Sequence, residues 1–310
     1  MLGSALGSAS GAVVTHESHF KRTLLERARD ATNGATAQAL YETIARDEQI
    51  RAMWEMTPKA RVDGVSQDAF ELARRILFDV VDQYAELIGR SPWNCWVDHS
   101  PPNVHLIRDM LELAPDAKFI HILRDGRAIA ASILPLDFGP SDALSAGSWW
   151  VYEVAHGLAA ELAFPDRVIR VRYEDLVAQP ELELRRICDF AGLEFNPGML
   201  NADALPKTAF VKGTHRLVGS AISNSRVSAW RTKLAGRRLE LFEYGAGHML
   251  DLLGYKRATK AIACQPTNLE RTISQFSAPF RKLAKRWRLR SRAIRAERGL
   301  RADKGQPVAQ

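Results

Sequence analysis

The segment from Lys118 to Ser132, KFIHILRDGRAIAAS, changes abruptly from an apolar run to a helical pattern. The run FIHIL is typical of a buried strand that ends at Arg124. Asp125 and Gly126 form a turn pair, whose glycine lets the backbone come close to a bound group. The helix start offers unpaired N–H groups, to which Arg124 and Ser132 add polar donors. The segment therefore predicts a strand, a turn and a helix that suit a phosphate, although an ordinary turn with a surface arginine has the same pattern.

A second strand end is predicted in NCWVDHSPPN, residues 94–103. The short apolar stretch ends at Asp98. Ser100 then suits the N-cap of a helix and Pro101 suits its first position.

A third strand is predicted in RVIRVRYEDLV, residues 167–177, with Tyr173 at its carboxyl end. A helix follows from about 180 to 191, and Gly192 closes it. The functional candidates thus fall at the carboxyl ends of strands, which is the edge where open parallel sheets bind ligands.

The three segments and two later ones, SRVSAW (225–230) and HMLDLLGY, resemble in order and spacing the sulfotransferases that use 3'-phosphoadenosine 5'-phosphosulfate (PAPS), in particular their bacterial and tyrosylprotein-type branch. The resemblance implies an α/β, P-loop-like three-layer fold with a central parallel sheet flanked by helices. It places the sulfotransferase domain at residues 1–255, followed by a basic extension, helical or partly disordered, at 256–310. The implied reaction moves a sulfuryl group from PAPS, the co-substrate, to a hydroxyl or amine, without a metal.

The resemblance also implies roles for particular residues. Arg124 and Ser132 would hold the 3'-phosphate of the nucleotide. Tyr173 would lie against the adenine, with a core tyrosine as the alternative. Ser225 and Arg226 belong to a late segment that would close over the nucleotide.

Sulfuryl transfer needs a general base for the acceptor, and two candidates stand out. Glu17, in HESHF, occupies the position that the resemblance gives to the acidic residue beside the acceptor. His99 titrates near neutrality and follows a strand end, where many relatives carry a lysine. Its role as base, sulfuryl contact or spectator stays open. His16 and His19 lack a third ligand at a recognisable spacing, so no metal site is predicted.

One motif expected from the resemblance, a P-[RK]-S-G-T-[TS] loop for the 5'-phosphosulfate, occurs nowhere in the sequence. We therefore expect the first strand and this loop to be missing, and the chain as written to be impaired. The alternatives are a catalytically incompetent nucleotide-binding remnant and a P-loop kinase-like NTPase. The absence of GxxxxGK[ST] weighs against the latter.

Composition places the basic charge in the tail. Residues 281–304 hold eleven Lys or Arg and two acids, a net of +9 against +7 for the whole chain. Such a segment suits an anionic surface or an acidic partner, or is a solvated extension, and it has no base-reading motif for a specific nucleic acid. The sequence has no apolar run of the ~20 residues that a transmembrane segment needs.

Three widely spaced cysteines without a CxxC pair suit a cytoplasmic protein. Cys188 and Trp230 are predicted to pack in the core, as is Trp54 within a largely helical stretch from Phe20 to Arg90. The acceptor stays open: peptide, carbohydrate, lipid and small alcohols all fit.

Overall fold

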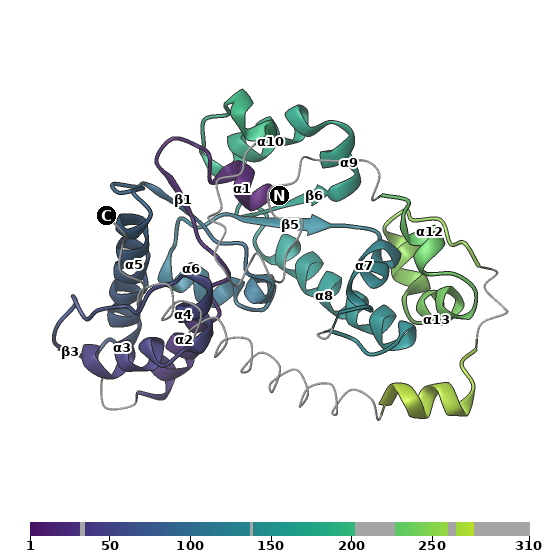
Figure 1. The fold of residues 1–310 in the computed structure, drawn as a ribbon, viewed down its shortest axis with the longest axis horizontal. Coiled ribbons are helices and arrows are strands. Elements are labelled where there is room, and N and C mark those ends of the chain that lie inside the picture. Colours follow the sequence, from purple (N-terminus) through teal and green to yellow (C-terminus); the bar gives the residue numbers. More distant parts are fainter. Residues whose placement is uncertain (32–34, 137–138, 202–226, 260–264, 276–310) are drawn as a thin grey trace, which may run out of the picture. The chain divides into compact units, whose positions relative to one another are not determined.

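A computed structural model describes residues 1–31, 35–136, 139–201, 227–259 and 265–275 (Figure 1). These residues form two compact units. The first unit contains residues 1–118 and 184–201, and the second contains residues 119–183 and 227–275. Each unit has its own buried core and its own pair of parallel strands. The predicted 281–304 tail lies outside the described residues.

The first unit is mainly helical. Its elements are α1 (Leu2–Leu6), β1 (Ala12–Val14), α2 (Phe20–Asp30), β2 (Ala35–Thr36), α3 (Ala37–Ala45), α4 (Glu48–Met53), β3 (Val65–Ser66), α5 (Ala69–Leu87), β4 (Cys95–Val97), the 3-10 helix η1 (Pro101–His105), α6 (Ile107–Leu113) and the 3-10 helix η2 (Pro197–Asn201).

The first unit's core lies where α2, α3 and α5 pack together. Asp68 caps α5 by accepting a hydrogen bond from the Glu71 N–H, and the following apolar residues recur at helical spacing. The ring of Trp54 lies between Phe20 and Tyr84, at centroid distances of 5.3 and 4.8 Å. The helical prediction for Phe20–Arg90 and the core position of Trp54 are therefore confirmed.

Strands β1 and β4 pair in parallel, with Ala12 opposite Cys95 and Val14 opposite Val97. Parallel pairing places the carboxyl ends of both strands at one edge, where the chain turns away at Thr15 and Asp98. The short antiparallel pair β2–β3 completes the described strands of this unit.

The second unit consists of β5 (Phe119–Leu123), α7 (Gly126–Ile133), α8 (Ala143–Ala163), β6 (Val168–Arg172), α9 (Tyr173–Ala178), α12 (Trp230–Lys233) and α13 (Arg237–Leu252). Helix α10 (Pro180–Ala191) carries the chain from this unit back to the first. Residues 268–275 are also helical. The predicted strands before Arg124 and Tyr173 and the predicted helix at 180–191 are confirmed.

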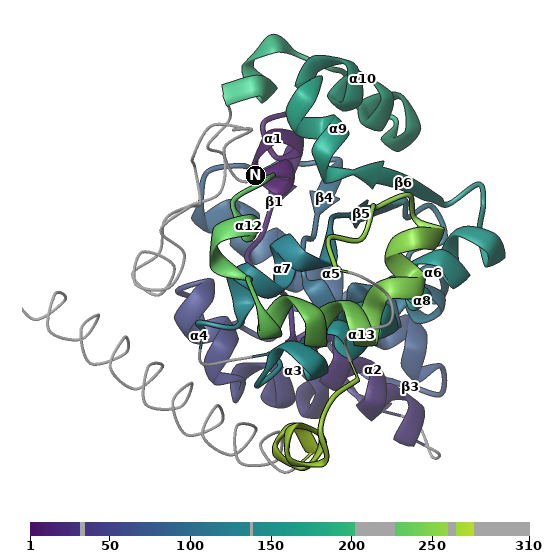
Figure 2. The ribbon, with the colours of Figure 1, turned by 90° about the vertical axis from the view of Figure 1, so that its right-hand side faces the viewer.

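Strands β5 and β6 pair in parallel over their full length, with Leu123 opposite Arg172. Figure 2 shows α12 and α13 beside α7 and α8, in agreement with the contacts between these helices. The rings of Trp150 and Phe242 are buried in the core that these helices enclose. Trp230 is buried in the same core, as predicted.

Two local predictions need comment. Cys188 is fully buried and donates to Met199 Sδ at 3.7 Å, which confirms its packing role. Ser100 is the N-cap residue of η1 and Pro101 follows it, as predicted, but the Ser100 side chain makes no cap hydrogen bond. The hydroxyl donates to Asp98 at 2.6 Å and accepts from the Ser18 N–H at 2.7 Å instead.

Candidate functional site

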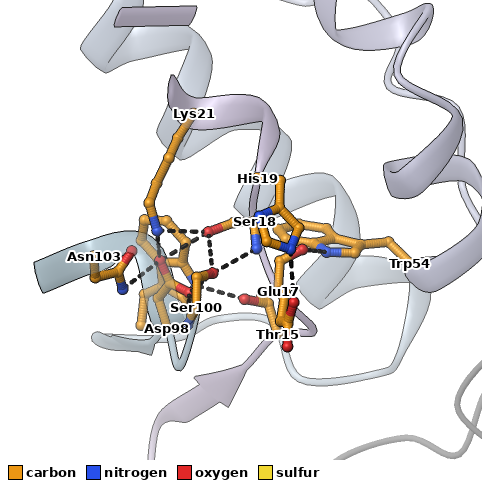
Figure 3. Close-up of polar contacts among 10 residues, drawn as sticks. Thr15, Glu17, Ser18, His19, Lys21, Trp54, Asp98, Ser100 and Asn103 are labelled. Carbon is orange, nitrogen blue, oxygen red and sulfur yellow. Dashed lines mark hydrogen bonds and ion pairs between the residues drawn. The ribbon is translucent and has the colours of Figure 1, made fainter. Parts of the chain in front are cut away.

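In the first unit, the candidate base Glu17 and its competitor His99 lie on the segments that leave β1 and β4. Figure 3 shows Glu17 and the neighbours of both residues. The strand pairing continues one step further, because the Thr15 N–H donates to the Val97 carbonyl at 3.2 Å. Trp96 Nε1 donates to Thr15 Oγ1 at 2.9 Å and fixes the same edge. The two strands thus deliver the two candidates to neighbouring segments. The sequence predicts the strand before His99 but not β1, which precedes Glu17.

A buried polar cluster joins these segments. The Asp98 carboxylate pairs with Lys21 and accepts hydrogen bonds from Ser18 Oγ at 2.8 Å and Asn103 Nδ2 at 3.2 Å. It also accepts from the N–H and hydroxyl of Ser100 at 3.0 and 2.6 Å. Ser100 Oγ accepts in turn from the Ser18 N–H at 2.7 Å. Figure 3 shows these side chains converging on Asp98.

Asp98 is ionised in this setting. Burial alone would raise its pKa, but the charge of Lys21 and the hydrogen bonds from Lys21, Ser100 and Ser18 outweigh burial, and the pKa is lowered. Burial acts on Lys21 in the opposite direction and lowers its pKa. We assign the charged pair because five donors surround the Asp98 carboxylate.

Glu17 is held at both its side chain and its backbone. Its Oε2 lies 2.6 Å from His19 Nε2, and its carbonyl accepts from Trp54 Nε1 at 3.3 Å. The carboxylate is partly exposed, so an acceptor hydroxyl has access to it.

His99 is exposed at its edge but packs against α1, where a Cβ on Gly3 would lie 3.1 Å from its ring. Desolvation lowers the pKa of His99, and the charges of Asp98 and Glu17 only partly offset this. The ring therefore favours the neutral form, which can accept a proton.

In the second unit, Arg124 and Tyr173 follow β5 and β6 directly. The register places Leu123 beside Arg172, so the next residue of each strand lies at the same edge. The Arg124 guanidinium carbon lies 4.2 Å from the centre of the Tyr173 ring, a cation–π contact. The structure thus brings these two predicted site residues together.

The start of α7 differs from the expected open turn. The Asp125 side chain caps the helix by accepting from the Arg127 N–H at 2.9 Å, so that donor is already satisfied within the protein. Gly126 is required for packing rather than for a ligand: an added Cβ would lie 2.4 Å from Trp150 Cδ2. The anion-binding potential of this turn therefore depends on Arg124 more than on open helix N–H groups.

Arg127, three residues after Arg124, is fully engaged inside the protein. Its guanidinium donates to both Asp125 oxygens at 2.8 to 3.2 Å, to Glu243 Oε1 at 2.8 Å and to the Lys256 carbonyl at 2.9 Å. It also lies 4.1 Å from the centre of the Trp230 ring. Arg127 is therefore a structural residue that ties α7 to α12 and α13.

Ser132 is exposed on α7, so its hydroxyl is accessible. Ser225 and Arg226 lie outside the described residues. Glu17 and His99 belong to the first unit, whereas Arg124, Ser132 and Tyr173 belong to the second.

No group of three or more metal-ligating side chains occurs within the part of the chain that the structure describes. His16 is buried, and His19 contacts Glu17. Among the described residues, no helix is long and apolar enough to cross a membrane.

Sequence reasoning missed three residues at the second unit's site. Glu174 accepts from the Asp125 N–H at 3.0 Å and from the Tyr255 hydroxyl at 3.0 Å. Glu243 binds Arg127 and also accepts from the N–H groups of residues 258 and 259 at 2.8 to 3.2 Å. Glu174 stands next to Tyr173, and Tyr255 ends HMLDLLGY, so both lie in motifs that carried the resemblance. Nothing local marks Glu243, because its partners are distant in the chain.

Parallel strand pairs with charged and aromatic side chains at their carboxyl ends define an α/β protein suited to an anionic ligand. Residues 2–197, well over half of the chain, match the sulfotransferase family. The chain therefore belongs to the sulfotransferase family.

Curated relatives agree at a distance. The protein-tyrosine sulfotransferase of Drosophila melanogaster is 26% identical over 191 residues, which are 58% of this chain and 37% of that protein. Human carbohydrate sulfotransferase 2 is 32% identical over 127 residues, 38% of this chain and 24% of that protein. The chain covers only 58% and 53% of two Caenorhabditis relatives, so it spans little more than half of their length.

Solved structures support the fold. The sulfotransferase domain from the curacin biosynthetic pathway has a TM-score of 0.51 at 17% identity, over 82% of this chain and 93% of that domain. The sulfotransferase domain of the Synechococcus PCC 7002 olefin synthase has a TM-score of 0.52 at 22% identity, over 82% of this chain and 90% of that domain. The described chain is thus a mixed α/β structure, with small parallel strand pairs flanked by helices, that resembles sulfotransferase domains.

Proposed function

We propose that this protein is a PAPS-dependent sulfotransferase that transfers a sulfuryl group to a hydroxyl or amine of an acceptor. The observation that carries the proposal is Arg124: a half-buried guanidinium at the end of a parallel strand, backed by the ring of Tyr173 at 4.2 Å. A planar guanidinium fork fits the oxygens of a phosphate group. Family membership supports PAPS as the co-substrate.

In this proposal Arg124 and Ser132 bind the 3'-phosphate of the nucleotide. Tyr173 supports Arg124 with one face of its ring and lies near the adenine. Ser225 and Arg226, outside the described residues, complete the nucleotide site. The described strands form separate pairs. A central parallel sheet, as in a P-loop-like fold, is therefore part of this proposal.

The reaction forms a bond between the acceptor oxygen or nitrogen and sulfur, and breaks the bond between sulfur and the 5'-phosphate oxygen. The nucleotide leaves as 3'-phosphoadenosine 5'-phosphate (PAP), and the acceptor proton passes to a base. Glu17 is our first candidate, because its carboxylate is partly exposed and held by His19 at 2.6 Å. His99 is the second, because its lowered pKa keeps the ring ready to accept a proton.

The acceptor class follows from the relatives only as a proposal. Relatives named as protein-tyrosine and carbohydrate sulfotransferases both match parts of this chain. We therefore propose a peptide or carbohydrate hydroxyl as the first acceptors to test.

Calorimetric titration with PAP tests the nucleotide site. Arg124→Ala removes a charge-assisted contact to the phosphate, so PAP binding should weaken by about tenfold or more. Arg74→Ala is the matched control, because this exposed arginine forms a local ion pair with Glu71, three residues before it, and the variant should leave PAP binding unchanged. Equal PAP affinity in the wild type and Arg124→Ala would overturn the assignment.

A further inference from the structure

The peptide segment at Arg124 is held by the first two residues of α9. The Tyr173 ring contacts the guanidinium, and Glu174 Oε1 accepts at 3.0 Å from the Asp125 N–H, the amide that follows the Arg124 carbonyl. One residue therefore contacts the tip of the Arg124 side chain, and its neighbour binds the peptide group that joins Arg124 to Asp125. Together they restrict both ends of the arginine.

Glu174 is itself oriented by Tyr255. The Tyr255 hydroxyl donates to Glu174 Oε2 at 3.0 Å, so the two carboxylate oxygens have separate partners. Tyr255 is buried, and the Arg172 guanidinium lies 4.5 Å from its ring centre. Arg172 also donates to the Leu253 carbonyl at 2.8 Å, which fixes the backbone just before Tyr255.

The phenol is a permanent donor in this arrangement. Burial and the charge of Glu174 raise the pKa of Tyr255, with Arg172 acting weakly in the opposite direction. The hydroxyl thus keeps its proton at neutral pH, and the carboxylate keeps its orientation toward the Asp125 N–H.

We propose that Glu174 and Tyr255 are positioning residues for recognition of a 3'-phosphorylated nucleotide: the chain of contacts from Tyr255 through Glu174 to the Asp125 N–H holds Arg124 in its phosphate-binding position. Neither residue touches the nucleotide. The inference rests on the proposed function of Arg124. It assigns the carboxyl end of HMLDLLGY to phosphate selectivity.

The electrostatic effect of Glu174 has the opposite sign, which makes the inference testable. A carboxylate near Arg124 repels an anion, so removing it without any structural consequence would tighten phosphate binding. Loss of affinity after Glu174→Ala therefore reports on the position of Arg124 and not on charge. Asp175→Ala is the matched control, because it removes an exposed carboxylate from the same turn of α9.

The experiment measures binding of PAP and of 5'-AMP, which lacks the 3'-phosphate, to the full chain. Glu174→Ala and Tyr255→Phe should each weaken PAP binding by about tenfold, because each removes a hydrogen bond to a charged group, and should leave 5'-AMP binding unchanged. Glu174→Gln keeps an acceptor oxygen for the Asp125 N–H, and the Tyr255 hydroxyl can accept from its amide N–H, so this variant should restore PAP affinity. Tyr244→Phe should behave as the wild type, because the Tyr244 hydroxyl accepts only from Arg271, at 3.3 Å, among the described residues.

Three outcomes separate the possibilities. Equal weakening for PAP and 5'-AMP indicates general disruption and overturns the inference. The second outcome is unchanged PAP affinity in Tyr255→Phe, whose folding is checked by its thermal melt. If Arg124→Ala in the same series abolishes PAP selectivity, this outcome also overturns the inference. If Arg124→Ala itself leaves PAP selectivity intact, the proposed nucleotide site fails before the positioning roles are reached.

Discussion

Asp98→Asn is the most informative perturbation of the first unit, because it removes the buried negative charge without changing the size of the side chain. In the wild type this carboxylate accepts from five donors, one of which is the ammonium of Lys21, whose side chain is only 2% exposed. The amide carries no charge, so the buried ammonium loses its ion-pair partner and keeps its hydrogen bond to Ser18 Oγ, at 2.9 Å. Breaking a buried pair on one side costs about 3 to 5 kcal/mol of unfolding free energy.

Urea unfolding followed by circular dichroism measures this cost. At a slope of about 3 kcal/mol per molar urea, the midpoint should fall by about 1 to 1.7 M. Asp82→Asn is the matched control in the same unit: this exposed carboxylate accepts a hydrogen bond from Trp93, at 2.7 Å, and its loss should cost less than about 1 kcal/mol. A loss below about 1 kcal/mol for Asp98→Asn would refute the buried-pair reasoning.

The pH dependence of the same comparison follows from the lowered pKa of Asp98. A carboxylate with a depressed pKa contributes stability above its unfolded value, about 3.9, and loses it as the pH falls through the folded value. The stability difference between wild type and Asp98→Asn should therefore be constant near neutrality and narrow in acid, below pH about 4. A difference that stays constant down to pH 2 would contradict ionised Asp98.

Two other predictions concern packing and catalysis. Gly126→Ala places a carbon about 2.4 Å from Trp150 Cδ2 and should lower the unfolding free energy by about 1 to 3 kcal/mol; an unchanged thermal midpoint would contradict this. Glu17→Ala should leave PAP affinity intact and reduce turnover of a tyrosine peptide or carbohydrate acceptor by about 10² to 10⁴-fold, measured as PAP release, since a general base contributes that much. A retained rate would move the role of base to His99.

The local elements were predictable because each depends on short-range patterns. The strand before Arg124, the strand before Tyr173 and the helix at 180–191 follow from apolar periodicity and from Gly192, whose φ is +70°. The placement of His99 after a strand follows from the same patterns, whereas β1, which precedes Glu17, was not predicted.

The exact use of polar residues was not predictable. Ser100 has the sequence position of an N-cap, yet its hydroxyl donates a hydrogen bond to Asp98, because that carboxylate is close in space and buried. The sequence suggests a surface position for Lys21, because lysine is rarely buried unless it is paired. Its partner, Asp98, lies 77 positions away in the chain. Gly126 suggests a ligand contact, but the space beside it is filled by Trp150.

By itself, the sequence determined the order of strands and helices and the motifs that place charged residues at strand ends, because these depend on neighbours within about one turn. Only the tertiary structure decided which charges meet. Arg127 could have faced a ligand, but Glu243, 116 positions away, engages it inside the protein. Tyr255 joins Glu174 across 81 positions in the same way. Such pairings arise because a buried charge or hydroxyl is stable only where packing brings it a partner, and packing is a property of the folded chain.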